Sequence, residues 1–186
     1  MQIVLIRHGK PKIEHLKAIS ANEFGLWVQE YDLADIDMEY LPSNETLDIA
    51  QKCSKIICSD LPRSIISARL LQREPDIIDI RFREAKMPSA KWTYPIFSTK
   101  TWMLFFRVFQ LLGYSANAET IFEIKSRAEG CTETLVKYAK EHGSVLFVGH
   151  GIINWFIERR LKSMSWYVDK RSNRDYWGYR VYRYSV

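Results

Sequence analysis

Apolar residues are gathered into short runs along this chain, and four of these runs predict buried β-strands. They cover residues 1–6, 55–58, 77–82 and 144–148. Short runs with few polar residues are typical of strands that are covered on both faces, as in a parallel sheet. A further run, residues 176–184, is rich in aromatic residues and predicts a final edge strand.

Capping and breaking residues place helices between these strands. Ser43 or Asn44 can cap a helix over about residues 45–52. Pro62 suits the first turn of the next helix, and we expect Asp60 to cap that helix. Strands that alternate with helices in this way predict an α/β fold in which the strands run parallel.

The second half of the chain continues this alternation. Residues 117–142 predict one long helix, or two helices if Gly130 interrupts the pattern. Gly143 is expected to end it, because glycine tolerates the backbone conformation that follows a helix. A last helix is predicted over residues 152–161, after the fourth strand.

Two stretches are less regular. Residues 12–39 predict a short helix followed by an irregular acidic segment at 32–39. Residues 86–112 are rich in aromatic side chains, and 101–112 predicts an apolar helix that contains Arg107. A buried helix is the favoured interpretation of this segment, and a helix on a membrane surface is the alternative.

Composition narrows the class of protein. A chain of 186 residues is expected to fold as one domain. No apolar run is long enough to span a bilayer, and the N-terminal run is too short for the core of a signal peptide. The three cysteines, Cys53, Cys58 and Cys131, have no metal-type spacing, so we expect them to pack in a reduced, cytoplasmic protein.

The net charge of +5 is compatible with nucleic acid, an anionic membrane surface or small phosphorylated compounds. The basic residues are scattered, so charge alone does not choose among these partners. The aromatic and arginine-rich residues 176–183 could stack on bases, but an edge strand is the favoured interpretation. His15 and His142 are expected at the surface.

Chemically useful side chains follow the predicted strands. Arg7 and His8 end the first strand, Arg63 follows the second, Glu84 the third and His150 the fourth. Because the carboxyl ends of parallel strands lie at one edge of a sheet, these side chains are expected to meet there. Guanidinium groups match phosphate oxygens two at a time, so the pattern predicts a pocket for a dianion. Gly9 would let the ligand come close to the main chain.

Four segments together resemble the histidine phosphatase superfamily, which is also called phosphoglycerate mutase-like. They are Arg7-His8-Gly9, residues 59–64, Arg83-Glu84 and Gly149-His150-Gly151. The resemblance covers nearly the whole chain. It implies a three-layer α/β/α sandwich with a mostly parallel central sheet, in a single domain over 1–186, with a variable cap at about 86–115. It also implies that no metal and no cofactor are needed.

The resemblance assigns roles to the residues at the strand ends. His8 would be the nucleophile that becomes phosphorylated, and Arg7, Arg63 and His150 would bind the phosphoryl group. His150 is expected to act as a cationic clamp, not as a base. Glu84 would donate a proton to the leaving group.

Gly9 and Gly151 stand beside the two histidines in these motifs and are expected at the substrate site. The chain departs from the family elsewhere. Lys10-Pro11 replaces a Thr or Ser that many members carry, and Gly149 stands where Ser is common. The Gly-Trp-x-Asp stretch of the family is not recognisable around residues 27–37. These differences concern substrate choice more than the core chemistry.

The sequence thus predicts a phosphatase that hydrolyses a phosphomonoester through phosphohistidine. Its partner would be a small phosphorylated substrate or a phosphoprotein, with neither nucleic acid nor membrane, and no oligomeric state is indicated. A phosphomutase and a protein phosphatase, including one acting on phosphohistidine, use the same pocket and are alternatives. Two other classes are a non-catalytic phosphate-binding protein and a metal-dependent hydrolase with His8, His150, Asp60 and Glu84 as ligands, against which the nearby arginines argue.

Overall fold

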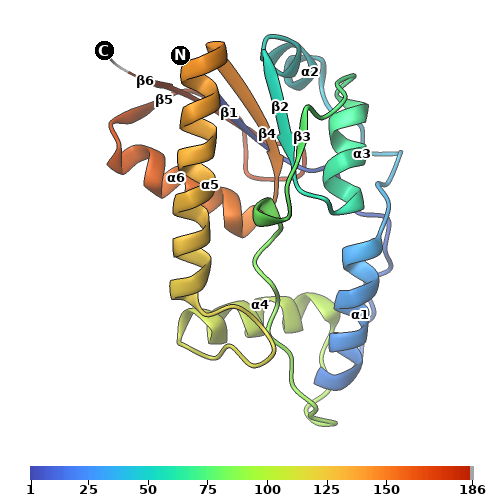
Figure 1. The fold of residues 1–186 in the computed structure, drawn as a ribbon. Coiled ribbons are helices and arrows are strands. Elements are labelled where there is room, and N and C mark those ends of the chain that lie inside the picture. Colours follow the sequence, from blue (N-terminus) through green and yellow to red (C-terminus); the bar gives the residue numbers. More distant parts are fainter. Residues whose placement is uncertain (185–186) are drawn as a thin grey trace.

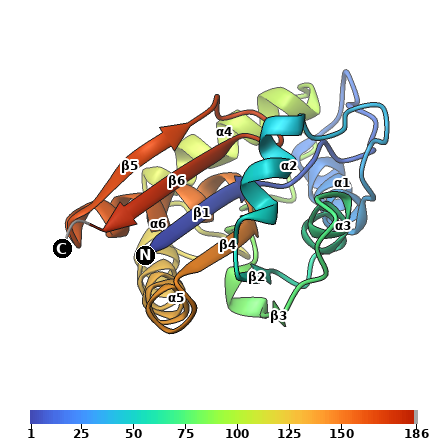
Figure 2. The same ribbon diagram turned by 90° about the horizontal axis from the view of Figure 1, so that it is seen from above.

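The computed structural model describes residues 1–184, which form a six-stranded sheet with helices on both faces (Figure 1). The order of the strands is β3-β2-β4-β1-β6-β5 (Figure 2). The first four run parallel, and β6 is antiparallel to both β1 and β5. The sheet is therefore mostly parallel, as predicted. The strands are β1 (Gln2–Arg7), β2 (Lys55–Cys58), β3 (Ile77–Ile78), β4 (Ser144–Gly149), β5 (Trp166–Arg171) and β6 (Tyr179–Tyr184).

Alternate residues of the central strands bury opposite faces of the sheet. On β1, Ile3 and Leu5 pack with α5 and α6, whereas Val4 and Ile6 pack with α2 and α3. This alternation confirms the three-layer arrangement of helices, sheet and helices. The helices are α1 (Ala21–Leu33), α2 (Asn44–Gln51), α3 (Pro62–Leu70), η1 (Ile80–Phe82, a 3₁₀ turn), α4 (Thr99–Leu111), α5 (Ile121–His142) and α6 (Gly151–Ser163).

Helix boundaries follow the capping residues of the sequence. Ser43 accepts a hydrogen bond from the Thr46 N–H and caps α2. Gly143 ends α5 with a φ of +80°, which favours glycine, and Gly130 lies inside α5 without interrupting it. Of the two alternatives for residues 117–142, the single helix is the one that forms.

The predicted strand over residues 77–82 is wrong beyond Ile78. Asp79 accepts a hydrogen bond from the Arg81 N–H at 2.9 Å, and the chain turns there into η1. The turn carries Phe82 into the core, where its ring lies 4.8 Å from that of Phe147. The apolar run is therefore divided between a short edge strand and a turn that packs under the sheet.

The prediction that Asp60 caps α3 is also wrong. Its two carboxylate oxygens accept hydrogen bonds from Arg83 Nε at 2.6 Å and Nη2 at 2.5 Å. The residue at the cap position is Leu61, which makes no side-chain capping bond. A bidentate, charge-assisted pair competes successfully with a single bond to a backbone N–H.

The C-terminal residues form more sheet than predicted. β6 begins at Tyr179 and lies between β1 and β5, so it is an inner strand and the prediction of an edge strand is wrong. The edge strand on this side of the sheet is β5. Its second half, which contains Lys170, is polar, so the strand gave no apolar run. None of the helices within residues 1–184 combines the length and the apolar character that crossing a bilayer demands.

A third hydrophobic cluster lies away from the sheet, between α1 and α4. The rings of Phe24 and Trp27 on α1 pack with Trp102 and Phe106 on α4. Trp102 is fully buried and donates from Nε1 to the Ile19 carbonyl at 2.8 Å. The α4 region, defined as residues 86–120, lies beyond the end of the sheet (Figure 1) and is held by an aromatic core that it shares with α1. The buried helix predicted for 101–112 is buried on one face only.

The remaining surface and core predictions are confirmed. His15 and His142 are exposed. Cys53, Cys58 and Cys131 are buried and free, and burial raises the pKa of each thiol to about 12. They act as small apolar packing residues.

Candidate active site

His8 lies at the carboxyl end of β1 and is 2 % exposed. Its Nδ1 is 2.7 Å from the Gly9 carbonyl oxygen, which can only accept, so Nδ1 carries the proton. Burial lowers the pKa of His8 well below its usual value, and the nearby His150, Arg63 and Arg7 lower it further against the opposing effect of the Gly9 carbonyl. The ring is therefore neutral at pH 7, and Nε2 has a free lone pair.

His150 occupies the N-cap position of α6, directly after β4, and its side chain makes no capping hydrogen bond. Its ring centroid is 5.0 Å from that of His8, and its Nε2 is 2.7 Å from the hydroxyl of Ser59. Burial, followed by Arg63 and Arg7, lowers the pKa of His150 well below its usual value. In the free protein His150 is thus neutral. The cationic state expected from the sequence would require a bound anion to raise this pKa.

Arg63 is held from two sides in the first turn of α3. Its guanidinium donates to the Tyr31 carbonyl at 3.2 Å and to Asp32 Oδ1 at 3.0 Å, and it lies 4.9 Å above the Tyr31 ring. Only 1 % of Arg63 is exposed. Sequence reasoning missed Tyr31 and Asp32 as its partners, although the acidic segment that begins at Asp32 was a signal of them.

Arg7 is held by the C-terminal part of the chain. Its Nη1 donates to the Arg174 carbonyl at 3.2 Å, and its guanidinium lies 4.5 Å above the Tyr176 ring. The Tyr176 ring is also 5.7 Å from the ring of His8. These contacts come from the segment between β5 and β6, which the sequence did not connect with the site.

Unpaired polar atoms cluster around His8. Within residues 1–184, six buried side-chain nitrogen or oxygen atoms have no hydrogen-bond partner, and three of them are Arg7 Nε, Arg63 Nε and His150 Nδ1. A buried donor without a partner costs about 1–3 kcal/mol, so such atoms are rare unless a ligand uses them. Their grouping beside a neutral imidazole is what a phosphoryl dianion requires.

Glu84 lies on the same side of the sheet, at the N-terminus of α6. Its carboxylate accepts hydrogen bonds from the N–H groups of Ile152 and Ile153 at 3.1 Å and from that of Ala85 at 2.9 Å. Burial raises the pKa of Glu84, but Arg107 and these backbone donors lower it by more, so the net shift is downward. The free protein therefore holds Glu84 as a carboxylate.

The structure places Gly151 in this pocket and gives Gly9 a different surrounding. A Cβ at Gly151 would lie 3.6 Å from Glu84 Oε2 and 3.9 Å from Arg7 Cζ, so this glycine separates the acid from the guanidinium. A Cβ at Gly9 would overlap the ring of Trp177, and the Gly9 N–H donates to Ser67 Oγ at 2.8 Å. Packing against Trp177 accounts for glycine at position 9, and its place in substrate binding stays a prediction.

A cleft of about 940 Å³ joins this site to the α4 region. Arg7, His8 and Arg63 line this cleft together with residues of α1, α4 and α6. Within residues 1–184, no three His, Cys, Asp or Glu side chains come close enough together to hold a metal ion. The alternative ligand set of His8, His150, Asp60 and Glu84 is therefore not assembled.

Comparisons with known proteins concern the family and the fold of the chain. Residues 3–176 match the sequence model of the histidine phosphatase superfamily (branch 1). A search of curated proteins found no significant match. The solved structures give the fold but not the substrate, because their sequence identities to this chain are low.

Three of these structures illustrate the similarity. YhfR from Bacillus stearothermophilus has a TM-score of 0.57 at 16% identity, over 87% of this chain and 80% of that one. A mycobacterial glucosyl-3-phosphoglycerate phosphatase has a TM-score of 0.55 at 16% identity, over 86% and 78%. TTHB049 from Thermus thermophilus has a TM-score of 0.54 at 16% identity, over 87% and 85%.

Proposed function

The chain belongs to the histidine phosphatase superfamily, and from that premise we propose that it hydrolyses a phosphomonoester through a phosphohistidine at His8. Membership of the family and its structural neighbours support a phosphatase- or mutase-type activity. The observation that carries the finer proposal is the free Nε2 of a buried, neutral His8 among unpaired nitrogens of Arg7, Arg63 and His150.

The first step is attack by His8 on phosphorus. A phosphomonoester dianion repels nucleophiles until its charge is compensated, and the two guanidinium groups supply that compensation. His8 Nε2 then forms a bond to phosphorus while the ester P–O bond breaks, and the Gly9 carbonyl stabilises the proton left on Nδ1.

Glu84 is the proposed proton carrier for both steps. A bound dianion opposes the ionised carboxylate and raises its pKa, which lets Glu84 give a proton to the departing oxygen. It is then ionised again and can accept a proton from the water that attacks the phosphohistidine. In that second step an O–P bond forms, the N–P bond breaks and inorganic phosphate leaves.

Trapping the intermediate tests this proposal. The protein is mixed with p-nitrophenyl phosphate, quenched in alkali and examined by mass spectrometry. We expect phosphate on His8 that survives alkali and is lost in acid, as phosphoramidates are. The His8→Ala variant should lose turnover by about 10⁴-fold or more, and the exposed His15→Ala variant should keep it. Phosphate on Ser59 or Ser64 would refute the assignment.

Labelled water separates hydrolysis from phosphoryl transfer to another alcohol. If water is the acceptor, one ¹⁸O from H₂¹⁸O enters each phosphate released. A mutase would instead return the phosphoryl group to a hydroxyl of the substrate and release little inorganic phosphate. Phosphate release with ¹⁸O incorporation would support the phosphatase over the mutase.

A further inference from the structure

We propose that the substrate is an amphiphile, with a phosphomonoester at one end and a long apolar body that lies along the cleft against α4. This inference rests on the proposed function, because it takes the site around His8 as the place of the phosphate. It concerns the part of the cleft beyond that site.

Three helices give this part of the cleft apolar walls. α1 supplies Trp27 and Val28, α4 supplies Met103 and Leu111, and α6 supplies Trp155. Methionine and aromatic side chains adapt to apolar groups of irregular shape. Burial of a hydrocarbon body against these walls would remove it from water and stabilise the complex.

The same walls carry few neutral polar groups, and their polar side chains are mainly charged ones such as Lys86, Arg107 and Glu119. Among the described residues that line the cleft there is no Ser, Thr or Asn. Gln110 is the one side-chain amide, and it is occupied: its Nε2 donates to the carbonyls of Lys86 and Glu119, and its Oε1 accepts from Arg107. Charged groups of the lining are occupied as well: Arg107 donates to the Ala85 carbonyl and to Gln110, and Arg127 pairs with Glu119. A sugar would have to compete with these bonds for its hydrogen-bond partners. The lining therefore disfavours a sugar phosphate.

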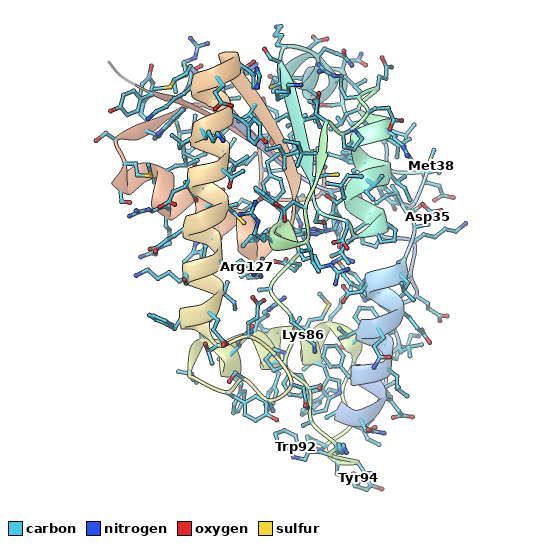
Figure 3. All side chains as sticks on the ribbon, viewed as in Figure 1. Asp35, Met38, Lys86, Trp92, Tyr94 and Arg127 are labelled. Carbon is cyan, nitrogen blue, oxygen red and sulfur yellow. The ribbon has the colours of Figure 1, made fainter. Side chains whose placement is uncertain are left out.

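The charge of the α4 region fits an anionic amphiphile. Between Glu84 and Glu119 the sequence contains no Asp or Glu, but it contains three lysines and Arg107. Lys86 lines the cleft, where it lies between the end of the sheet and α4 (Figure 3). An apolar wall bordered by cations attracts a molecule that combines a negative headgroup with hydrocarbon.

An apolar stripe on α4 continues the cleft outward. Leu104, Val108 and Leu111 share one face of the helix, and they are 68 %, 44 % and 62 % exposed. Leu111 belongs both to this stripe and to the wall of the cleft. Because Trp102 and Phe106 anchor the opposite face of α4, the stripe is held in place beside the cleft. A chain too long for the cleft would lie on it.

A series of n-alkyl phosphates from ethyl to octyl, kept below micelle-forming concentrations, tests the inference. Each methylene that is buried should raise kcat/KM by about three- to fourfold, so the octyl ester should exceed the ethyl ester by at least about a hundredfold. Glucose 6-phosphate should be a poorer substrate than the octyl ester. A rise of less than about threefold along the series, or a preference for the sugar ester, would overturn the inference.

A pair of neighbouring substitutions locates the effect. Leu111→Glu puts a charge on the wall of the cleft and should lower the octyl-to-ethyl ratio of kcat/KM by at least about tenfold. Leu112→Glu is the matched control, because Leu112 is 78 % exposed and does not line the cleft. It should leave that ratio unchanged. Equal ratios in both variants would contradict the placement of the apolar body.

Binding of n-alkyl phosphonates, which cannot be hydrolysed, separates failure of this inference from failure of the proposed function. Calorimetry on the wild-type protein should show affinity rising with chain length. Such a rise without hydrolysis of any ester would refute the phosphatase and keep the amphiphile site. Hydrolysis that depends on His8 but not on chain length would keep the phosphatase and refute the amphiphile site.

Discussion

Two regions of this protein face each other across the cleft and bury opposite kinds of side chain. Around His8 the buried groups are polar, and Arg63 and His150 are almost fully enclosed. In the α4 region the buried groups are mainly aromatic, with Trp102 and Phe106 at the centre. The first region can hold charge on a reacting phosphoryl group, and the apolar walls of the second suit hydrocarbon.

The two regions also differ in how they are fixed. The arginines of the site are oriented by hydrogen bonds to distant segments; Arg63, for example, donates to Asp32. α4 is fixed by ring packing together with hydrogen bonds to nearby carbonyls, such as those from Trp102 to Ile19 and from Gln110 to Lys86 and Glu119. Ring packing tolerates changes of size and shape better than a hydrogen-bonded cation tolerates loss of its geometry. The contrast suggests that chemistry depends on the sheet edge and substrate choice on α4.

Among the substitutions that compare the two regions, the largest predicted effect on activity comes from removal of a cation at the sheet edge. Arg63→Ala should lower kcat/KM by about a hundred- to a thousandfold, because a group that stabilises charge in the transition state is lost. Arg63→Lys should recover only part of this rate, since an ammonium cannot make two parallel bonds. Steady-state kinetics on p-nitrophenyl phosphate measure both effects.

Arg69→Ala is the matched control for this prediction. Arg69 is on the same helix, but it is exposed and pairs with Glu74. It should keep a rate within about twofold of wild type, as exposed ion pairs contribute little. A near-wild-type rate for Arg63→Ala, with the fold retained by circular dichroism, would mean that the strand ends do not converge on the reacting group.

Glu84 lies where the two regions meet, and Arg107 of α4 lowers its pKa. Its substitution therefore tests both regions. Glu84→Gln should slow an alkyl phosphate about a hundredfold more than p-nitrophenyl phosphate, since only the alkoxide needs a proton to leave. A hundredfold difference is at the low end of the rate enhancement expected from general acid catalysis, because the carboxyl group of Glu84 is ionised in the free protein. Single-turnover measurements isolate the phosphorylation step.

Asp60→Asn is the control for the acid, because Asp60 is a carboxylate near the same strand ends that pairs with Arg83. It should slow both substrates to a similar, small extent. If Glu84→Gln also slowed them equally, its role would be limited to capping α6. The proton for the departing alkoxide would then have to come from another group.

The smallest predicted effect is on stability as pH changes. His8 and His150 have pKa values lowered by burial and nearby cations, so the unfolded chain binds their protons more tightly than the folded one. Their contribution to the free energy of unfolding is complete above pH 6.5, the value of an unperturbed histidine, and is lost as pH falls below it. Each histidine should contribute a loss of up to about 1.4 kcal/mol per pH unit.

Urea unfolding between pH 7.5 and 5 measures this loss. His8→Asn removes one of the two titrating groups and should make the dependence on pH shallower in this range. The substitution His142→Asn, at an exposed position, is the matched control. If His8→Asn left the pH dependence of the free energy of unfolding unchanged, the buried histidines would not be its cause.

Part of the site could be predicted from the sequence because it depends on where strands end. Arg7 and His8 follow β1, and His150 follows β4, which is the direct neighbour of β1 in the sheet. Strand ends that are far apart in the chain must meet once the strands are parallel. Arg63 could be predicted because Pro62 begins α3, so Arg63 lies in the first turn of that helix.

Other features depend on contacts that no local pattern contains. β5 is half polar and gave no apolar run, and Asp79 ended β3 early because its side chain accepts a hydrogen bond from the Arg81 N–H. The partner of Asp60 is Arg83, a choice that only the folded chain offers. Trp177, which explains glycine at position 9, approaches it from the far end of the chain.

The sequence by itself determined the alternation of strands and helices and the residues at the sheet edge, because these follow from periodicity and local backbone preferences. The three layers were implied by the family resemblance. Tertiary structure alone decided the charge state of those residues. Enclosure beside two arginines makes His8 and His150 neutral, and the N-terminus of α6 with Arg107 keeps Glu84 ionised. A pKa depends on burial and on neighbouring charges in space, and neither is present in the order of residues along the chain.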